Sequence, residues 1–271
     1  MQSWHKRNEY YVLEEESMAT DLKPGNYFIS TNNFGQLVLK EVEMKADGII
    51  TFDAHPYTTF TEEIRTFFSS KEHYDKLRVT HKRGIILYGP PGCGKSVLLV
   101  SATKAVSALG GIVFHLRHSN FADFGSCLRK FKQYDKRPVM VVMEDLDTLI
   151  EESWDETCAL ELFDGSSILE GSTLFLATTN NLQDIPKRIS YRPSRFDTLF
   201  EMPYPHEEVR RTYIQSLVSG TETSDEVMEN MIRESRGLSI AMLKELVIGH
   251  LVYRRPLVEI AERLRATITE E

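Results

Sequence analysis

The run "GPPGCGKS" at positions 89–96 has the residue types and the spacing of a loop that binds phosphate groups. Glycines at 89, 92 and 94 let backbone N–H groups turn inward without a Cβ in the way, which forms a nest for an anion. The run follows a predicted strand and opens a predicted helix, whose N-terminus adds partial positive charge. A chance match of these residue types in this setting is rare. The loop therefore predicts nucleotide binding.

Two side chains of this loop carry the chemistry expected at a nucleoside triphosphate. The Lys95 ammonium can reach the β- and γ-phosphates, and the Ser96 hydroxyl can ligate Mg²⁺. Cys93 is interpreted as a loop filler rather than a nucleophile, because phosphoryl transfer needs no covalent group from the protein. ATP and Mg²⁺ are the expected cofactors. The residues predicted to contact the nucleotide are Gly89, Pro90, Pro91, Gly92, Cys93, Gly94, Lys95, Ser96 and Val97.

An acidic motif, "VVMEDLD" at 141–147, follows a short apolar run. In phosphoryl-transfer sites one acid at a strand end holds Mg²⁺, and a second orients the attacking water. Glu144, Asp145 and Asp147 are the acids available for these roles. The alternative is a solvated acidic turn between a buried strand and a helix. The phosphate loop favours the catalytic interpretation.

Unbroken apolar runs alternate with helical patterns from residue 84 onward, and these elements must position the site. Such runs are typical of a parallel sheet covered by helices on both faces, so we predict an α/β fold. Upstream, residues 61–77 have near-helical spacing, with Thr61 in an N-terminal cap signal. The expected strands are 84–88, 111–116, 139–143 and 172–179, and the expected helices between them are 95–108, 119–134 and 155–164.

The two ends of the chain differ from this central pattern. Residues 25–44 contain two β-rich runs with a hairpin signal, and 47–52 could form a third strand. The pattern of residues 206–271 predicts helices, with breaks at Gly220 and Gly237 and a last helix after Pro256. The predicted division is a small β-containing N-terminal module over 1–60, a P-loop NTPase domain over 61–205 and a small helical domain over 206–271.

Composition limits the classes of protein that fit. The 271 residues are 41% hydrophobic and 27% charged, as in an ordinary soluble globular protein. No apolar run approaches the length of about 18 residues that a transmembrane helix needs, so no membrane association is expected. Three cysteines without metal-ligand spacing indicate a reducing, cytoplasmic setting. A net charge of −8 argues against a protein whose main affinity is for nucleic acid.

Taken together, the motifs give the chain a resemblance to AAA-family ATPases over about residues 61–255. The segments entering the phosphate loop and the acidic motif both resemble the family, and they occur in the family's order. The resemblance implies a P-loop core followed by a helical lid domain, and a homo-oligomeric ring of six subunits. The remaining segments that resemble the family are "LELFDG" (160–165), "TTNN" (178–181), "RPSRFD" (192–197) and "RGLSIAMLKEL" (236–246).

The resemblance assigns roles to individual residues. By register with the family, Glu144 takes the Mg²⁺ position and Asp145 the water-orienting position, while Asp147 is a structural acid of the next turn. Asn180 matches the sensor residue, whose amide can bond the γ-phosphate or the water beside it. Arg192 and Arg195 match the family's arginine pair. Their Pro-containing loop predicts exposed guanidinium groups that reach a neighbouring subunit's nucleotide; the alternative is two surface arginines paired with nearby acids.

Two features depart from the common family pattern. The order Glu144–Asp145 reverses the usual Asp–Glu, and in this the chain resembles most the subgroup of the mitochondrial translocase of the Rieske iron–sulfur protein. The run "NFADFGS" at 120–126 does not clearly match an aromatic pore loop. Phe121 and Phe124 are therefore either pore residues or the apolar face of the 119–134 helix.

The leading expectation is an ATP-driven hexameric ring that remodels or translocates a protein client. Two alternatives remain open. One is a nucleic-acid-directed ATPase, such as a loader or a replication or packaging accessory, which the acidic composition disfavours. The other is a nucleotide-gated scaffold that assembles on ATP with little turnover.

Overall fold

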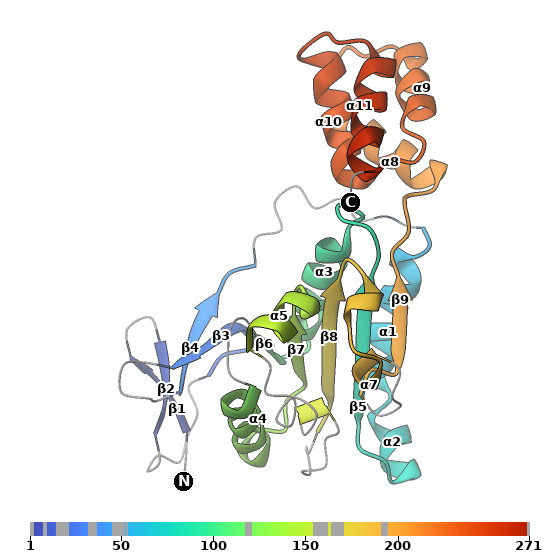
Figure 1. The fold of residues 1–271 in the computed structure, drawn as a ribbon. Helices are drawn as coiled ribbons and strands as arrows, with labels where there is room; N and C mark the ends of the chain where they lie inside the picture. The colour runs from blue at the N-terminus through green and yellow to red at the C-terminus, as the bar shows by residue number, and fades with distance from the viewer. Residues whose placement is uncertain are drawn as a thin grey trace.

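The structure is a computed structural model that describes residues 3–7, 10–14, 22–31, 37–44, 52, 54–116, 121–153, 162–163, 171–190 and 195–269. It has the mixed α/β architecture expected, with a largely parallel sheet between helices and a helical C-terminal part (Figure 1). The helical part lies beyond one end of the sheet, above the loops that follow its parallel strands in Figure 1.

One continuous sheet has the strand order β1-β2-β4-β3-β6-β7-β8-β5-β9. From β3 to β9 every neighbouring pair is parallel, and the pairs among β1, β2, β4 and β3 are antiparallel. The strands are β1 (Ser3–Arg7), β2 (Tyr10–Glu14), β3 (Gly25–Thr31), β4 (Leu37–Val42), β5 (Lys82–Tyr88), β6 (Ile112–His115), β7 (Val139–Met143), β8 (Thr173–Thr179) and β9 (Thr198–Glu201). The four central strands expected from the apolar runs are confirmed.

The central strands are apolar on both faces because both faces are covered. Successive side chains of a strand point to opposite faces, and β5 shows the consequence: Ile86 joins one buried cluster, whereas Ile85 and Leu87 join the other. Helices α4, α5 and α7 contribute to the first cluster, and α1 and α3 to the second. The helices of this part are α1 (Tyr57–Ser69), α2 (Lys71–Leu77), α3 (Lys95–Ala108), α4 (Phe121–Tyr134), α5 (Leu146–Ser153) and α7 (Lys187–Ser190).

The N-terminal strands continue the central sheet. The expected hairpin is confirmed, since β3 and β4 pair antiparallel from Asn26↔Val42 to Thr31↔Leu37. The other edge of β3 pairs in parallel with β6, which joins these strands to the sheet. The strand expected at 47–52 lies outside the described residues, except for Phe52, which is not in a strand. The division of the chain at residue 60 stays a prediction.

The start of the first helix was placed too late by the sequence pattern. Helix α1 begins at Tyr57, and Pro56 occupies the cap position without a side-chain cap. Thr61 is therefore no cap: its hydroxyl donates to the Tyr57 carbonyl within the helix, at 2.9 Å. Helix α5 and the short strand β9 were not predicted, and most of the expected helix 155–164 lies outside the described residues.

The C-terminal helices form a group with a buried cluster of their own, which includes Ile214, Met231 and Val247. The breaks expected at Gly220 and Gly237 fall just after two helix ends, and the last helix follows Pro256, as predicted. The helices are α8 (Glu207–Val218), α9 (Asp225–Glu234), α10 (Ile240–Leu251) and α11 (Leu257–Thr269). Among the described residues, no helix has the length and apolar character needed to span a bilayer.

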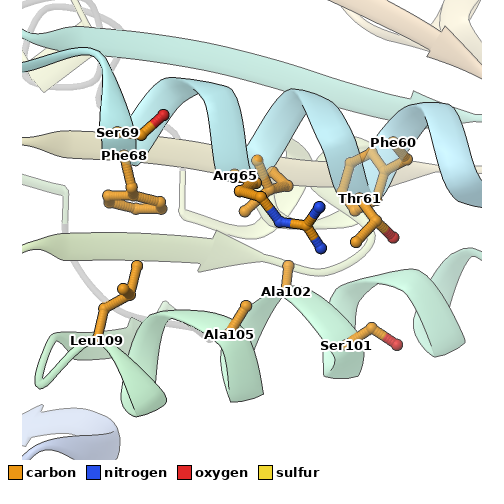
Figure 2. A pocket seen from close by; sticks show the side chains of 10 residues that line it. Phe60, Thr61, Arg65, Phe68, Ser69, Ser101, Ala102, Ala105 and Leu109 are labelled. Atoms are coloured by element: carbon orange, nitrogen blue, oxygen red, sulfur yellow. The ribbon is translucent and has the colours of Figure 1, made fainter.

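Helices α1 and α3 lie side by side and leave a mostly apolar groove of about 270 Å³ between them (Figure 2). Phe60 and Phe68 line it from α1, and Ala102 and Ala105 line it from α3. The small side chains of α3 keep the groove open, and the Arg65 guanidinium extends across it (Figure 2).

His81 joins the end of the α1–α2 region to the start of β8. It is 5% exposed, and its ring nitrogens lie 2.8 Å from the Phe67 carbonyl oxygen and 2.8 Å from the Ser172 hydroxyl. Burial lowers the pKa of His81 from its ordinary value, and the hydrogen bond to Phe67 opposes this shift. The neutral ring is therefore the form that the folded protein favours.

This burial predicts a pH-dependent stability. Because the folded pKa lies below the unfolded value of 6.5, the unfolded chain binds more protons, and His81's contribution is complete above pH 6.5 and lost as the pH falls below it. We expect His81→Gln to show a smaller fall in the free energy of unfolding than the wild type between about pH 7.5 and pH 5. Urea denaturation at each pH measures it. The matched control is His73→Gln, an exposed position on α2 that should keep the wild-type slope.

Candidate active site

The phosphate loop joins β5 to α3 and is held on both sides. Gly89, Gly92 and Gly94 have φ values of 144°, 73° and 97°, which L side chains rarely adopt. A Cβ on Gly92 would lie 2.8 Å from Ser239 Oγ at the start of α10, and a Cβ on Gly89 would lie 2.2 Å from the Met202 carbonyl oxygen. Glycine is therefore needed at these positions both for the backbone conformation of the loop and for its close contact with Met202 and Ser239.

Lys95 is the first residue of α3, and its side chain folds back into the loop. Its Nζ donates to the carbonyl oxygens of Gly89 and Pro90 at 2.6 and 3.1 Å, and to Asn180 Oδ1 at 2.8 Å. Burial lowers the pKa of Lys95, and the carboxylates of Asp145 and Asp147 oppose that shift. Lys95 and Asn180, which are far apart in the sequence, are thus brought together.

Cys93 packs in the loop as a neutral thiol. It is 1% exposed, and burial raises its pKa to about 11 despite the opposing charge of Lys95. A protonated thiol is a poor nucleophile, which agrees with the interpretation of Cys93 as a filler. The Tyr57 hydroxyl at the start of α1 donates to the Cys93 carbonyl at 3.2 Å, and its own pKa is raised to about 12, mainly by burial.

The remaining loop residues leave the phosphate position accessible. Pro91 and Ser96 are exposed, and Ser96 lies in the first turn of α3. The Val97 amide donates to the Gly94 carbonyl at 3.0 Å, so the helix is already formed at this point. A ligand at the loop could reach the Ser96 hydroxyl without displacing a packed side chain.

The acidic motif follows β7 directly. Glu144 and Asp145 form the turn between β7 and α5, and Asp145 is exposed with φ of 49°. The Asp145 amide donates to Thr178 Oγ1 at 3.1 Å, and its carbonyl accepts from the Leu149 amide at 3.0 Å. Asp147 lies in the first turn of α5, and its buried Oδ1 has no hydrogen-bond partner in the part of the chain that the structure describes.

The residues present fit a magnesium nucleotide. Among the described residues, no group of three or more His, Cys, Asp or Glu side chains could hold a metal by itself. Mg²⁺ is usually bound through one or two carboxylates together with substrate phosphates. Ser96 and Glu144 would then supply the protein oxygens, and the glycine-rich loop and Lys95 would receive the phosphates.

Asn180 follows β8 and borders a hollow of about 620 Å³. The neighbouring Asn181 uses its side chain locally, accepting from the Gln183 amide at 3.1 Å as the cap of a short 3₁₀ turn, η1 (Leu182–Asp184). Asn180, by contrast, is exposed and directed to Lys95. The hollow is lined by Tyr88, Asn180, Asn181, Leu182, Gln183, Ile185 and Lys187.

The exposure expected for Arg195 is wrong. Arg195 is 2% exposed, and its Nη1 donates to the Arg188 carbonyl at 2.6 Å. Its backbone also packs closely on β5, since a Cβ on Gly84 would lie 2.0 Å from the Arg195 carbonyl oxygen. Residues 195–197 lie directly before β9, which pairs with β5, and the Arg195 guanidinium is buried there, contrary to the exposure expected from the loop composition. Arg192 lies outside the described residues.

Of the two aromatic pore candidates, Phe124 belongs to the core. It is fully buried, and its ring lies 6.2 Å from that of Phe114 on β6. The interpretation as the apolar face of the helix is therefore confirmed for Phe124. The side chain of Phe121 lies outside the described residues.

Three contacts of the site were missed from the sequence. Tyr57 touches the loop from α1, Thr178 holds the Asp145 amide, and the Ala241 amide on α10 donates to the Gly92 carbonyl at 3.1 Å. Ser239 carried a usable signal, because a serine before an apolar helical run is a typical N-cap, and its hydroxyl does accept from the Met242 amide. Tyr57 had no such signal.

The two acids of the turn can be separated by mutation. We expect Glu144→Gln to weaken Mg²⁺-dependent nucleotide binding, because it would remove the oxygen expected to ligate Mg²⁺. Asp145→Asn should leave ATP bound and unhydrolysed, because it would remove the carboxylate expected to orient the attacking water. Titration of a fluorescent ATP analogue with and without Mg²⁺, together with phosphate release, measures both. The reverse pattern would show that the two roles are exchanged.

Comparison with known proteins supports the family resemblance. Residues 85–204 match the model of the ATPase family associated with various cellular activities (AAA). A protein of Plasmodium falciparum (isolate 3D7), named as a cell division cycle ATPase, is 26% identical over 194 residues, covering 65% of this chain and 15% of that protein.

Two proteasome-activating nucleotidases are also similar. The one from Methanothermobacter thermautotrophicus is 24% identical over 200 residues, covering 68% of this chain and 49% of the relative. The one from Saccharolobus islandicus (strain M.14.25 / Kamchatka #1) is 26% identical over 263 residues, covering 84% and 65%. The chain thus spans less than two thirds of the length of each of these relatives. Residues 85–204 are thus similar to the ATPase domain of the AAA family, and the chain is similar to proteasome-activating nucleotidases at 24–26% identity.

Proposed function

We propose that this protein hydrolyses ATP with Mg²⁺ in a homo-oligomeric ring and uses the energy to remodel or translocate a protein client. The observation that carries the proposal is the convergence on Lys95: the loop carbonyls and Asn180 bind its ammonium, and the nearby charges of Asp145 and Asp147 oppose the lowering of its pKa by burial. A phosphate loop, an acidic strand end and a sensor amide are the parts that ATP hydrolysis requires.

The similarity to proteasome-activating nucleotidases supports a protein client, because those relatives are named for an action on a protein assembly. The net charge of −8 supports the same choice over nucleic acid. The order of Glu144 and Asp145 still favours, within the family, the subgroup of the Rieske-protein translocase. The three-part division at residues 60 and 205, with the last part as a lid, belongs to the same proposal.

Arg192 is proposed as the arginine that completes a neighbouring subunit's site, while Arg195 holds the loop from within. The burial of Arg195 and its bond to the Arg188 carbonyl support this division of roles. A guanidinium supplied in trans stabilises the charge on the transferring phosphoryl oxygens. Hydrolysis then requires an oligomer.

The trans site predicts a complementation experiment. Lys95→Ala should lose nucleotide binding, and Arg192→Ala should bind ATP but lose most hydrolysis. Mixing the two inactive variants should restore part of the rate, because an intact loop on one subunit can meet an intact Arg192 on the next. Phosphate release from the mixture measures it. Failure of the mixture to recover any activity, with both variants shown to assemble together, would exclude completion in trans.

Arg195→Ala is the matched control for Arg192→Ala. It distinguishes the effect of losing a buried structural arginine from the effect of losing a catalytic one. We expect this variant to lower the free energy of unfolding by about 2–4 kcal/mol, because it empties a buried, hydrogen-bonded site. Arg192→Ala should leave the unfolding free energy near that of the wild type.

The identity of the client class has its own test. ATP turnover by the wild type is measured alone, with unfolded casein, and with single- and double-stranded DNA or RNA. We expect stimulation by the protein and none by the nucleic acids. Marked stimulation by a nucleic acid would favour the nucleic-acid-directed alternative, and assembly on ATP without phosphate release would favour the scaffold.

A further inference from the structure

The backbone of Asp145 has an unusual conformation. Its φ of 49° lies in the left-handed region, which non-glycine residues rarely occupy, although aspartate tolerates it better than most. The conformation turns the chain from the end of β7 into α5 within two residues. A residue at such a position needs fixed partners on its backbone if its side chain is to keep one direction.

Those partners are found on both sides of Asp145. The amide donates to Thr178 Oγ1 at 3.1 Å, and the carbonyl accepts from the Leu149 amide at 3.0 Å. The ladder between β7 and β8 ends with the pair Met143↔Ala177, so Thr178 is the next residue along β8. Its hydroxyl thus holds the chain of β7 just past the point where backbone pairing stops.

We propose that Thr178 is a positioning residue that fixes the direction of the Asp145 carboxylate during ATP hydrolysis. The proposal rests on the proposed function of Asp145. Thr178 is 4% exposed and belongs to a fully buried strand, so its hydroxyl is a rigid reference point. The Asp145 side chain is exposed, and its direction depends on its own backbone.

The same strand also places the sensor amide. Asn180 lies two residues after Thr178, and its Oδ1 accepts from Lys95. Strand β8 therefore sets the water-orienting acid through Thr178 and the phosphate-binding lysine through Asn180. A displacement of about 1 Å in such a constellation can lower a rate by about 100-fold.

Three substitutions test the proposal by steady-state kinetics. Thr178→Val removes the acceptor at nearly constant volume, and we expect a fall in kcat of about 10- to 100-fold with an ATP Kd within about threefold of the wild type. Thr178→Ser keeps the hydroxyl and should retain most of the rate. Thr178→Ala also removes the acceptor but leaves a smaller side chain. It should lower kcat as Thr178→Val does, even if the two variants differ in stability.

Strand β8 itself offers a matched control. Thr173, at its other end, is also fully buried, and its Oγ1 has no hydrogen-bond partner in the described part of the chain. Thr173→Val makes the same change far from the site. Thr173→Val should leave kcat unchanged. If only Thr178→Val lowers kcat, replacing a buried threonine of β8 by valine is not by itself the cause.

A second measurement does not depend on activity. Hydrogen exchange of the Asp145 amide should be faster in Thr178→Val than in the wild type, in Thr178→Ser and in Thr173→Val, because its acceptor is lost. The proposal is overturned by wild-type kcat in Thr178→Val, by an equal loss of rate in Thr178→Ser, or by unchanged exchange. If the wild type itself hydrolyses no ATP, the proposed function fails, and the exchange result still decides whether Thr178 holds Asp145.

Discussion

The rest of the site depends on the hydrogen bonds that the buried Lys95 ammonium donates. A charge removed from water costs several kcal/mol unless it is paired and hydrogen-bonded. Here it is satisfied by two carbonyls of the loop and the Asn180 amide oxygen, and its pKa is lowered mainly by burial. The lysine therefore ties the loop to the end of β8. The phosphate oxygens of a nucleotide offer the same ammonium stronger, charged acceptors.

The order of the strands explains why these groups meet. Strands β7, β8 and β5 are adjacent and parallel, so the acidic turn, Asn180 and the glycine-rich loop all follow strands at the carboxyl edge of the sheet. Ligands of open α/β sheets bind at this edge. The C-terminal helices reach the same place, because the Ala241 amide of α10 bonds the Gly92 carbonyl. A movement of the phosphate loop would therefore act directly on α10 through this hydrogen bond.

Much of this arrangement could be predicted from local patterns. The bounds of α3 and β7 follow from apolar periodicity and the glycine-rich loop. The contact between Lys95 and Asn180 follows because the residues after neighbouring parallel strands lie at the same edge of the sheet. What the sequence left open depends on long-range packing. Nothing near residue 195 signals a buried arginine, because its backbone packs against Gly84 of the distant strand β5, while its guanidinium bonds the Arg188 carbonyl seven residues earlier. The join between β3 and β6 and the bond from Thr178 to Asp145 likewise depend on register between distant strands.

Calorimetric titration of ATP with Mg²⁺ into the wild type and into Lys95→Met tests the central claim most directly. Methionine keeps much of the length and volume of the side chain and removes its charge. We expect saturable binding to the wild type and a loss of affinity of at least about 100-fold in the variant, because a buried charge-assisted contact to phosphate is removed. Equal affinities in two folded proteins would show that the phosphates do not bind at Lys95, and would contradict the site described above.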